Sequence, residues 1–102
     1  MRKIVNKKMY NTNTAVEIAS CSNDASTSDF NYYEETLYKK KTGEFFLYGE
    51  GNAASKYSRS CGTNNWCGGW AIKPMTNEEA REWMEKYGDV DKYIEVFGEL
   101  EE

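Results

Sequence analysis

The chain has 102 residues, enough for one small domain with a single hydrophobic core. Its 13 basic and 17 acidic residues give a formal net charge of −4, and its aromatic content of 15% excludes the aromatic-poor composition of a disordered chain. The sequence contains no histidine, which excludes imidazole bases, Ser–His or Cys–His nucleophile pairs and histidine-containing zinc sites. We expect residues 1–102 to form one domain.

The N-terminal segment is basic and is predicted to begin the fold with two short strands. Residues 1–8 contain four basic side chains, and no apolar block of the kind found in a signal peptide follows them. No apolar run approaches the roughly 18 residues that a membrane-spanning helix needs. We therefore expect a cytoplasmic protein that does not enter a membrane, with a short strand and its return over residues 3–10.

A short helix is predicted next, over residues 15–19. Either Thr12 or Thr14 is available to cap it, and Glu17 stands three residues after Thr14 as the partner in a capping box. The following segment, residues 20–31, is rich in Ser, Asn, Asp and Thr. These side chains favour local hydrogen bonds to the backbone, so this segment is predicted to be a loop.

The clearest pattern in the sequence predicts a β-hairpin over residues 32–48. Two aromatic-rich runs flank a short segment that ends at Gly43, and glycine supplies the positive φ that a bulged turn requires. Strand alternation sends the neighbouring side chains of Glu34 and Glu35 to opposite faces, so the two carboxylates cannot act on one substrate.

Both faces of this hairpin carry aromatic rings. In the second arm, Phe45 and Leu47 point to one face, while Phe46 and Tyr48 point to the other. One face must pack on the helices, and the other leaves hydroxyl-bearing rings for a partner. We assign Tyr38 and Tyr48 to that partner contact.

A third strand is predicted over residues 66–73, between glycine-rich or polar connections. The pair Gly68 and Gly69 would weaken this strand unless a bulge or a close backbone approach requires the missing side chains. Pro74 is expected to end it.

The three cysteines, Cys21, Cys61 and Cys67, are an odd number in a chain with no export signal, which argues against a disulfide framework. Cys61 and Cys67 remain able to pair, but we expect reduced thiols. Their five-residue spacer does not match a zinc knuckle, so no metal is expected.

The last third of the chain is predicted to form two helices. Thr76 is the expected N-cap of the first, with Glu79 completing a capping box and Gly88 ending the helix. The first helix is expected to bury Ala80, Trp83, Met84 and Tyr87, and the second to bury Val90, Ile94 and Phe97. The resulting fold class is α+β: a three-stranded antiparallel sheet with a short N-terminal helix and two C-terminal helices packed on it.

Charge is distributed unevenly along the chain. Residues 1–73 have ten basic and seven acidic side chains, a net charge of +3, whereas residues 74–102 have three basic and ten acidic side chains, a net charge of −7. An array of carboxylates can occupy a groove whose Lys and Arg side chains hold phosphates. We therefore predict a partner-binding set in this last third: Glu78, Glu82, Glu85, Asp89, Asp91, Glu95 and Glu99.

A second hypothesis is that the hairpin binds nucleic acid directly. Lys39, Lys40 and Lys41 lie beside Tyr38 and Tyr48, which resembles the basic and stacking surface of a single-strand binder. Lysines at a hairpin tip also serve solubility and edge protection. The glycines form neither a P-loop nor a dinucleotide fingerprint, so we expect no enzyme activity and no cofactor.

A set of short motifs extends over nearly the whole chain. They are YNT at 10–12, TA at 14–15, YEETLY at 33–38, KTGEFFL at 41–47, GEG at 49–51, SKY at 55–57, PMT at 74–76 and EAREW at 79–83. This set resembles a family of short proteins carried on plasmids, integrative elements and prophages of Gram-positive bacteria. Some small proteins of such elements are anti-CRISPR inhibitors of type II (Cas9) effectors, and the sequence is similar to that set.

The resemblance implies a non-enzymatic inhibitor that binds a Cas9-type effector or its guide-RNA complex in the bacterial host cell. Groove occupation by the acidic helices and interference with guide-RNA loading both remain open as mechanisms. One rival function is a small nucleic-acid-binding accessory protein of a mobile element, using Lys39, Lys40 and Lys41. Another is a structural homodimer that buries its aromatic outer face.

Overall fold

The protein is built around a four-stranded antiparallel sheet, as described by a computed structural model of residues 1–98. The spatial order of the strands is β3-β4-β5-β8, and two helices follow β8. The main sheet and its helices comprise β3 (Val16–Ser22), β4 (Tyr33–Lys39), β5 (Phe45–Gly51), β8 (Gly69–Met75), α1 (Asn77–Tyr87) and α2 (Val90–Phe97). The α+β class is thus confirmed, with four strands in the main sheet instead of three.

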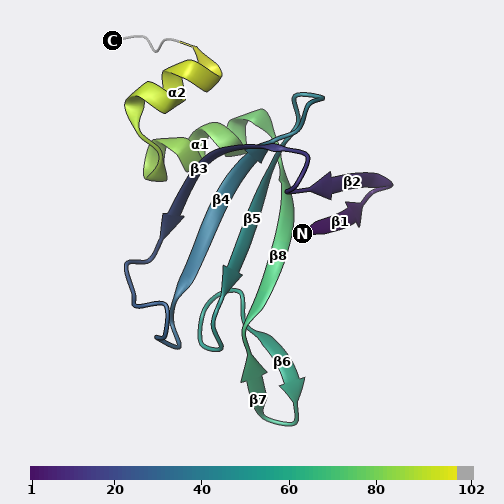
Figure 1. Cartoon of the computed structure of the whole chain (residues 1–102), viewed down its shortest axis with the longest axis vertical. Coiled ribbons are helices and arrows are strands. Elements are labelled where there is room, and N and C mark those ends of the chain that lie inside the picture. Colours follow the sequence, from purple (N-terminus) through teal and green to yellow (C-terminus); the bar gives the residue numbers. More distant parts are fainter. Residues whose placement is uncertain (99–102) are drawn as a thin grey trace.

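Two separate hairpins extend from this body. They are β1 (Arg2–Val5) with β2 (Lys8–Asn11), and β6 (Arg59–Gly62) with β7 (Asn65–Cys67). Figure 1 shows the helices gathered at one end of the main sheet and the β6–β7 hairpin beyond the opposite end. No helix among residues 1–98 is long and apolar enough to cross a membrane.

The predicted hairpin of β4 and β5 is confirmed, including its turn. The Lys40 N–H donates to the Glu44 carbonyl oxygen at 2.7 Å, and the Gly43 N–H donates to the Lys40 carbonyl oxygen at 2.8 Å. Gly43 has a φ of +94°, which a side chain would strain. The turn therefore fixes the register of the two strands.

The predicted N-terminal helix is wrong, because residues 15–19 fall mostly within strand β3. Thr14 does not cap a helix; its N–H instead donates to the Asn11 carbonyl oxygen at 3.3 Å. The β-branched residues Val16 and Ile18 favour an extended strand, and β4 supplies the hydrogen-bonding partner at the sheet edge. This strand continues to Ser22, which shortens the predicted loop.

The predicted third strand is divided between two sheets. Residues 65–67 pair with residues 59–62 in the small hairpin, whereas β8 begins only at Gly69 and continues through Pro74 to Met75. The close backbone approach expected at the two glycines is present. A Cβ at Gly68 would lie 2.8 Å from the Gly51 carbonyl oxygen, and one at Gly69 would lie 2.6 Å from the Tyr57 carbonyl oxygen.

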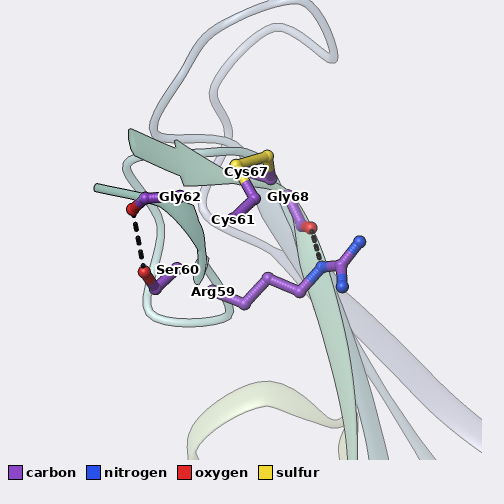
Figure 2. Close-up of a disulfide and its surroundings, with 6 residues drawn as sticks. All are labelled: Arg59, Ser60, Cys61, Gly62, Cys67 and Gly68. Carbon is purple, nitrogen blue, oxygen red and sulfur yellow. Dashed lines mark hydrogen bonds between the residues drawn. A yellow bond between two sulfur atoms is a disulfide. The ribbon is translucent and has the colours of Figure 1, made fainter. Parts of the chain in front are cut away.

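A disulfide joins Cys61 and Cys67 across this small hairpin, so the expectation of reduced thiols is wrong for this pair. Cys67 lies opposite Arg59, and Cys61 lies at the register shift two residues further along β6, where their Cα atoms are 5.9 Å apart, within the range of a disulfide. Figure 2 shows the bonded sulfurs and the Arg59 side chain, whose Nε donates to the Gly68 carbonyl oxygen at 3.2 Å. Cys21 is a free, half-buried thiol on β3.

The helices cover one face of the main sheet, called here the inner face. The predicted capping box is confirmed: Thr76 Oγ1 accepts from the Glu79 N–H at 3.1 Å, and Glu79 Oε1 accepts from the Thr76 N–H at 3.0 Å. Helix α1 buries three of its four predicted core residues, while Tyr87 remains 46% exposed. The inner core comprises Leu37, Phe45, Leu47, Ala80, Trp83, Met84 and Tyr93.

The predicted apolar stripe of α2 is only partly correct. Val90 and Ile94 are exposed, and the helix instead turns Tyr93 towards the core. The Tyr93 ring packs against Phe97 with centroids 5.0 Å apart, and Phe97 packs against Phe45 at 5.3 Å. Phe97 thus packs on the core as predicted, while Tyr93 takes the place expected for Val90 and Ile94 because its ring buries more apolar area than either aliphatic side chain.

The opposite, outer face of the sheet is only partly covered. Tyr10, Phe46 and Ile72 form a second small core, against which residues of the N-terminal hairpin pack. The Tyr10 and Phe46 rings meet edge to face, with centroids 5.5 Å apart. The rest of the outer face carries acidic and aromatic side chains of β4, β5 and β8.

Candidate partner-binding surface

Cross-strand pairing on the outer face places acidic and aromatic side chains in adjoining rows. Glu34 lies opposite Glu50, and Glu50 lies opposite Trp70, so these three residues form one row across β4, β5 and β8. Tyr48 belongs to the next row and Tyr38 to the one after it. We call these five residues the acidic aromatic face.

Glu34 and Glu50 form a pair of directly opposed carboxyl groups. A hydrogen bond with Glu34 raises the pKa of Glu50, and burial adds to that effect. The Tyr32 hydroxyl donates to Glu34 Oε2 at 2.8 Å, and the Tyr48 hydroxyl donates to Glu50 Oε2 at 2.9 Å. Neither carboxylate forms an ion pair with a cation among residues 1–98. The pair is therefore held by hydroxyl donors and lacks an ion-pair partner in the part of the chain that the structure describes.

Aromatic rings flank this carboxyl pair. The Tyr48 and Trp70 rings lie 6.2 Å apart, and Trp70 is 42% exposed. Tyr38 stacks on Phe46 with centroids 5.2 Å apart and an interplanar angle of 10°. Burial and the nearby carboxylates raise the pKa of both tyrosine hydroxyls, which therefore remain hydrogen-bond donors. The structure thus brings the two predicted tyrosines to one face.

Glu35 follows Glu34 on β4, and its side chain lies on the inner face, in a different environment. Glu35 is 3% exposed, and its Oε2 accepts from Lys56 Nζ at 2.8 Å and from the Tyr57 hydroxyl. Burial alone would raise the pKa of Glu35, but the hydrogen bonds from Lys56 and Tyr57 outweigh it and hold the pKa below the ordinary value. Tyr57 reaches this position because Gly49 has no Cβ, which would overlap its ring.

The predicted carboxylates of the helices lie on another part of the molecule. The predicted carboxylates of the described helical segment, Glu78, Glu82, Glu85, Asp89, Asp91 and Glu95, are exposed, while Glu99 lies outside the described residues. Asp89 caps α2 by accepting from the Lys92 N–H at 2.6 Å, and Glu95 pairs with Lys92 Nζ at 3.5 Å. Because these helices pack on the inner face, the structure does not join their carboxylates to Tyr38 and Tyr48 in one surface.

Two of the three hairpin lysines are engaged in contacts. Lys39 Nζ lies 5.6 Å from the centroid of the Phe45 ring. Lys40 Nζ lies 4.3 Å from the Tyr10 centroid and 3.7 Å from Glu44 Oε1. Lys41 is exposed. Two of the three ammonium groups are thus engaged within the protein, which leaves Lys41 as the lysine of this turn most available to a phosphate.

Sequence reasoning missed the opposition of Glu34 and Glu50 and the part played by Trp70. The signal for the carboxyl pair was present, because a turn that pairs Lys40 with Glu44 also sets Glu34 opposite Glu50. Comparison with known protein families, curated proteins and solved structures finds no match to this chain.

Proposed function

We propose that this protein is a non-enzymatic inhibitor that binds a cationic surface of a nucleic-acid-handling effector inside a bacterial host cell. The observation that carries the proposal is the acidic aromatic face. Its paired carboxylates form no ion pair with a cation among the described residues, and the exposed Trp70 ring and the half-buried Tyr48 ring lie beside them. This combination is complementary to Lys and Arg side chains, which bind carboxylates and stack on aromatic rings.

Such a surface is suited to competing with nucleic acid. Proteins that hold single strands use basic side chains for phosphates and stack bases on rings or guanidinium planes. On the acidic aromatic face, carboxylates take the place of phosphates, and Trp70 and Tyr48 take the place of bases. The face therefore offers an effector groove the same kinds of contact as a nucleic acid does. An arginine placed between Glu34 and Glu50 also relieves their mutual repulsion.

The resemblance to small proteins of Gram-positive mobile elements supports a CRISPR effector of the Cas9 type as the target. The exposed carboxylates of α1 and α2 provide a second acidic surface for the same groove or for blocking guide-RNA loading. Self-association through the acidic aromatic face is disfavoured, because it would bring Glu34 and Glu50 against their own copies.

A pull-down with immobilised protein tests the proposal, using Cas9 with and without guide RNA across a salt series. We expect retention that weakens as salt rises, because charge pairs are screened. Retention of Cas9 lacking guide would indicate interference with loading, whereas retention of the guide complex alone would indicate groove occupation. Retention of neither form would overturn the anti-CRISPR proposal.

Two sets of variants distinguish the acidic surfaces. The double variant Glu34→Gln and Glu50→Gln removes the carboxyl pair, and the triple variant Glu78→Gln, Glu82→Gln and Glu85→Gln removes charge from α1. We expect the double variant to weaken binding by about tenfold or more. Asp24→Asn, in an exposed loop, is the control and should leave binding unchanged.

An electrophoretic shift assay tests the alternative function. A shift of nucleic acid by this protein at low salt would favour the nucleic-acid-binding function of Lys39 to Lys41.

A further inference from the structure

The β6–β7 hairpin receives little support from the rest of the described structure. It lies beyond the end of the main sheet that is opposite the helices (Figure 1), and none of its residues belongs to either hydrophobic core of residues 1–98. Residues 59–66 are exposed, and Cys67 is half-buried. Burial of apolar side chains therefore contributes little to holding these two strands together.

Backbone pairing within this hairpin is short and interrupted. Three residue pairs join the two strands, and the register shifts at Cys61. A two-stranded hairpin is at best marginally stable in water even when its ladder is continuous. At the base of the hairpin, the hydrogen bond from Arg59 Nε to the Gly68 carbonyl oxygen is exposed to solvent. The covalent bond between Cys61 and Cys67 is therefore the main restraint on these strands.

The hairpin carries a large aromatic side chain, Trp66, which is 62% exposed. Trp66 pairs across the strands with Ser60, and the chain then passes through Cys67 and two glycines to Trp70 of the acidic aromatic face. The order of the hairpin thus decides whether the Trp66 ring has a fixed position next to this end of the sheet. That order depends on the disulfide.

We infer that the disulfide is a redox-sensitive switch of local order: a dithiol reductant opens it and disorders residues 59–67, while the main sheet and helices keep their structure. A thiolate of the reductant attacks the exposed Cys61 Sγ, the sulfur–sulfur bond breaks, and Cys67 Sγ leaves as a thiolate that takes up a proton. The second thiol of the reductant attacks the mixed disulfide and releases Cys61 as a thiol, so that the reductant becomes a cyclic disulfide. The switch is a property of this chain alone and does not depend on the proposed partner.

Nuclear magnetic resonance relaxation of the ¹⁵N-labelled protein, before and after dithiothreitol is added, tests the inference. Mass spectrometry confirms the reduction by the mass of two added hydrogen atoms. We expect the backbone amides of residues 59–67 and the Trp66 indole to become mobile on the nanosecond timescale. The indole of Trp83, which is 6% exposed in the inner core, should keep its position and its relaxation rates.

Variants and limited proteolysis give an independent readout. The double variant Cys61→Ser and Cys67→Ser should have a mobile hairpin without reductant, whereas the control Cys21→Ser keeps the disulfide and should respond like the unaltered protein. Trypsin should cleave after the exposed Arg59 about tenfold faster once the disulfide is open, while cleavage after Lys41, in the β4–β5 turn, should not change. Each of four results would overturn the inference: no disulfide in the oxidised protein, resistance to dithiothreitol, an ordered hairpin after reduction, or a change at Trp83 as large as that at Trp66.

Discussion

Glu34 and Glu35 are neighbours in the chain, yet the two faces of the sheet treat them in opposite ways. On the inner face, Glu35 is buried and its charge is balanced by Lys56 and supported by Tyr57. On the outer face, Glu34 meets another carboxyl group, Glu50, and receives a hydroxyl donor from Tyr32. Strand geometry alone separates these environments, because successive side chains point to opposite sides.

The comparison shows how a sheet of this size divides its roles. The inner face places its charged group in a satisfied network beneath the helices, so that charge contributes to the stability of the fold. The outer face leaves like charges opposed, which costs stability and is relieved by an incoming cation. The charge arrangement that is unfavourable in the isolated protein is therefore the one that supports the proposed binding role.

Truncating a core side chain is expected to show the largest difference in stability between the two faces. Leu37, fully buried on the inner face, should lose about 3 kcal/mol of unfolding free energy when changed to Ala, because a cavity remains. Tyr48→Ala on the half-buried outer face should cost about 1 kcal/mol. Urea unfolding of both variants measures the contrast, and equal losses would show that the faces are not packed differently.

Breaking the ion pair of Glu35 should have the next largest effect. Lys56→Met keeps the apolar stem but leaves the Glu35 carboxylate buried without its cation, and should cost about 2 kcal/mol of unfolding free energy. Glu35→Gln leaves only the half-exposed Lys56 unpaired and keeps an oxygen that accepts from the Tyr57 hydroxyl, so it should cost less. A loss with Lys56→Met no greater than that with Glu35→Gln would contradict the network described for the inner face.

Acidification should act on the two faces in opposite directions. The pKa of Glu35 is lowered by folding, so its stabilising effect is complete above the ordinary glutamate value of about 4.3 and is lost as the pH falls through its lower folded pKa. The pKa of Glu50 is raised, so its protonation stabilises the folded state as the pH falls from neutrality towards about 4.3.

Thermal unfolding across this pH range tests the opposition. We expect a small rise in stability between neutral pH and about 4.3, followed by a fall. Glu50→Gln should abolish the rise, and Glu35→Gln should reduce the fall. Glu44 and Glu79, whose pKa values are also lowered, add to the fall in every variant. A rise that survives in Glu50→Gln would assign it to another group.

The smallest effect is expected from Glu34→Gln, and its sign is the informative part. The substitution removes repulsion between opposed carboxyl groups and should stabilise the protein by about 0.5 kcal/mol. The corresponding substitution at the next residue, Glu35→Gln, is expected to destabilise the protein. Chemical unfolding in parallel with Glu35→Gln provides the comparison, and destabilisation by both variants would remove the distinction between the faces.

Local patterns predicted the elements whose partners lie close in sequence. The β4–β5 hairpin and the capping box of α1 were correct because a turn glycine and a Thr-to-Glu spacing act within a few residues. The segment containing Val16 and Ile18 was misassigned as a helix because its capping-box pattern was local, whereas its pairing with β4 was not. Tertiary pairing decided that segment over local propensity.

The candidate site was predictable only in part, for the same reason. Alternation placed Tyr38 and Tyr48 on one face, but recognising the carboxyl pair required the register of the turn to be followed six residues outward to Glu34 and Glu50. The contacts of Glu35 depend on Lys56 and Tyr57, which a connecting segment brings back across the sheet. No residue spacing in the sequence predicts that Lys56 and Tyr57 contact Glu35.

The placement of the disulfide has a consequence for where the protein can fold. Cys61 and Cys67 join two strands that already pair with each other, in a small hairpin separate from the main sheet. The bond joins no strand of the main sheet and neither of its helices, so its restraint acts within the hairpin. We therefore expect the main sheet and its helices to form under thiol-rich and oxidising conditions alike.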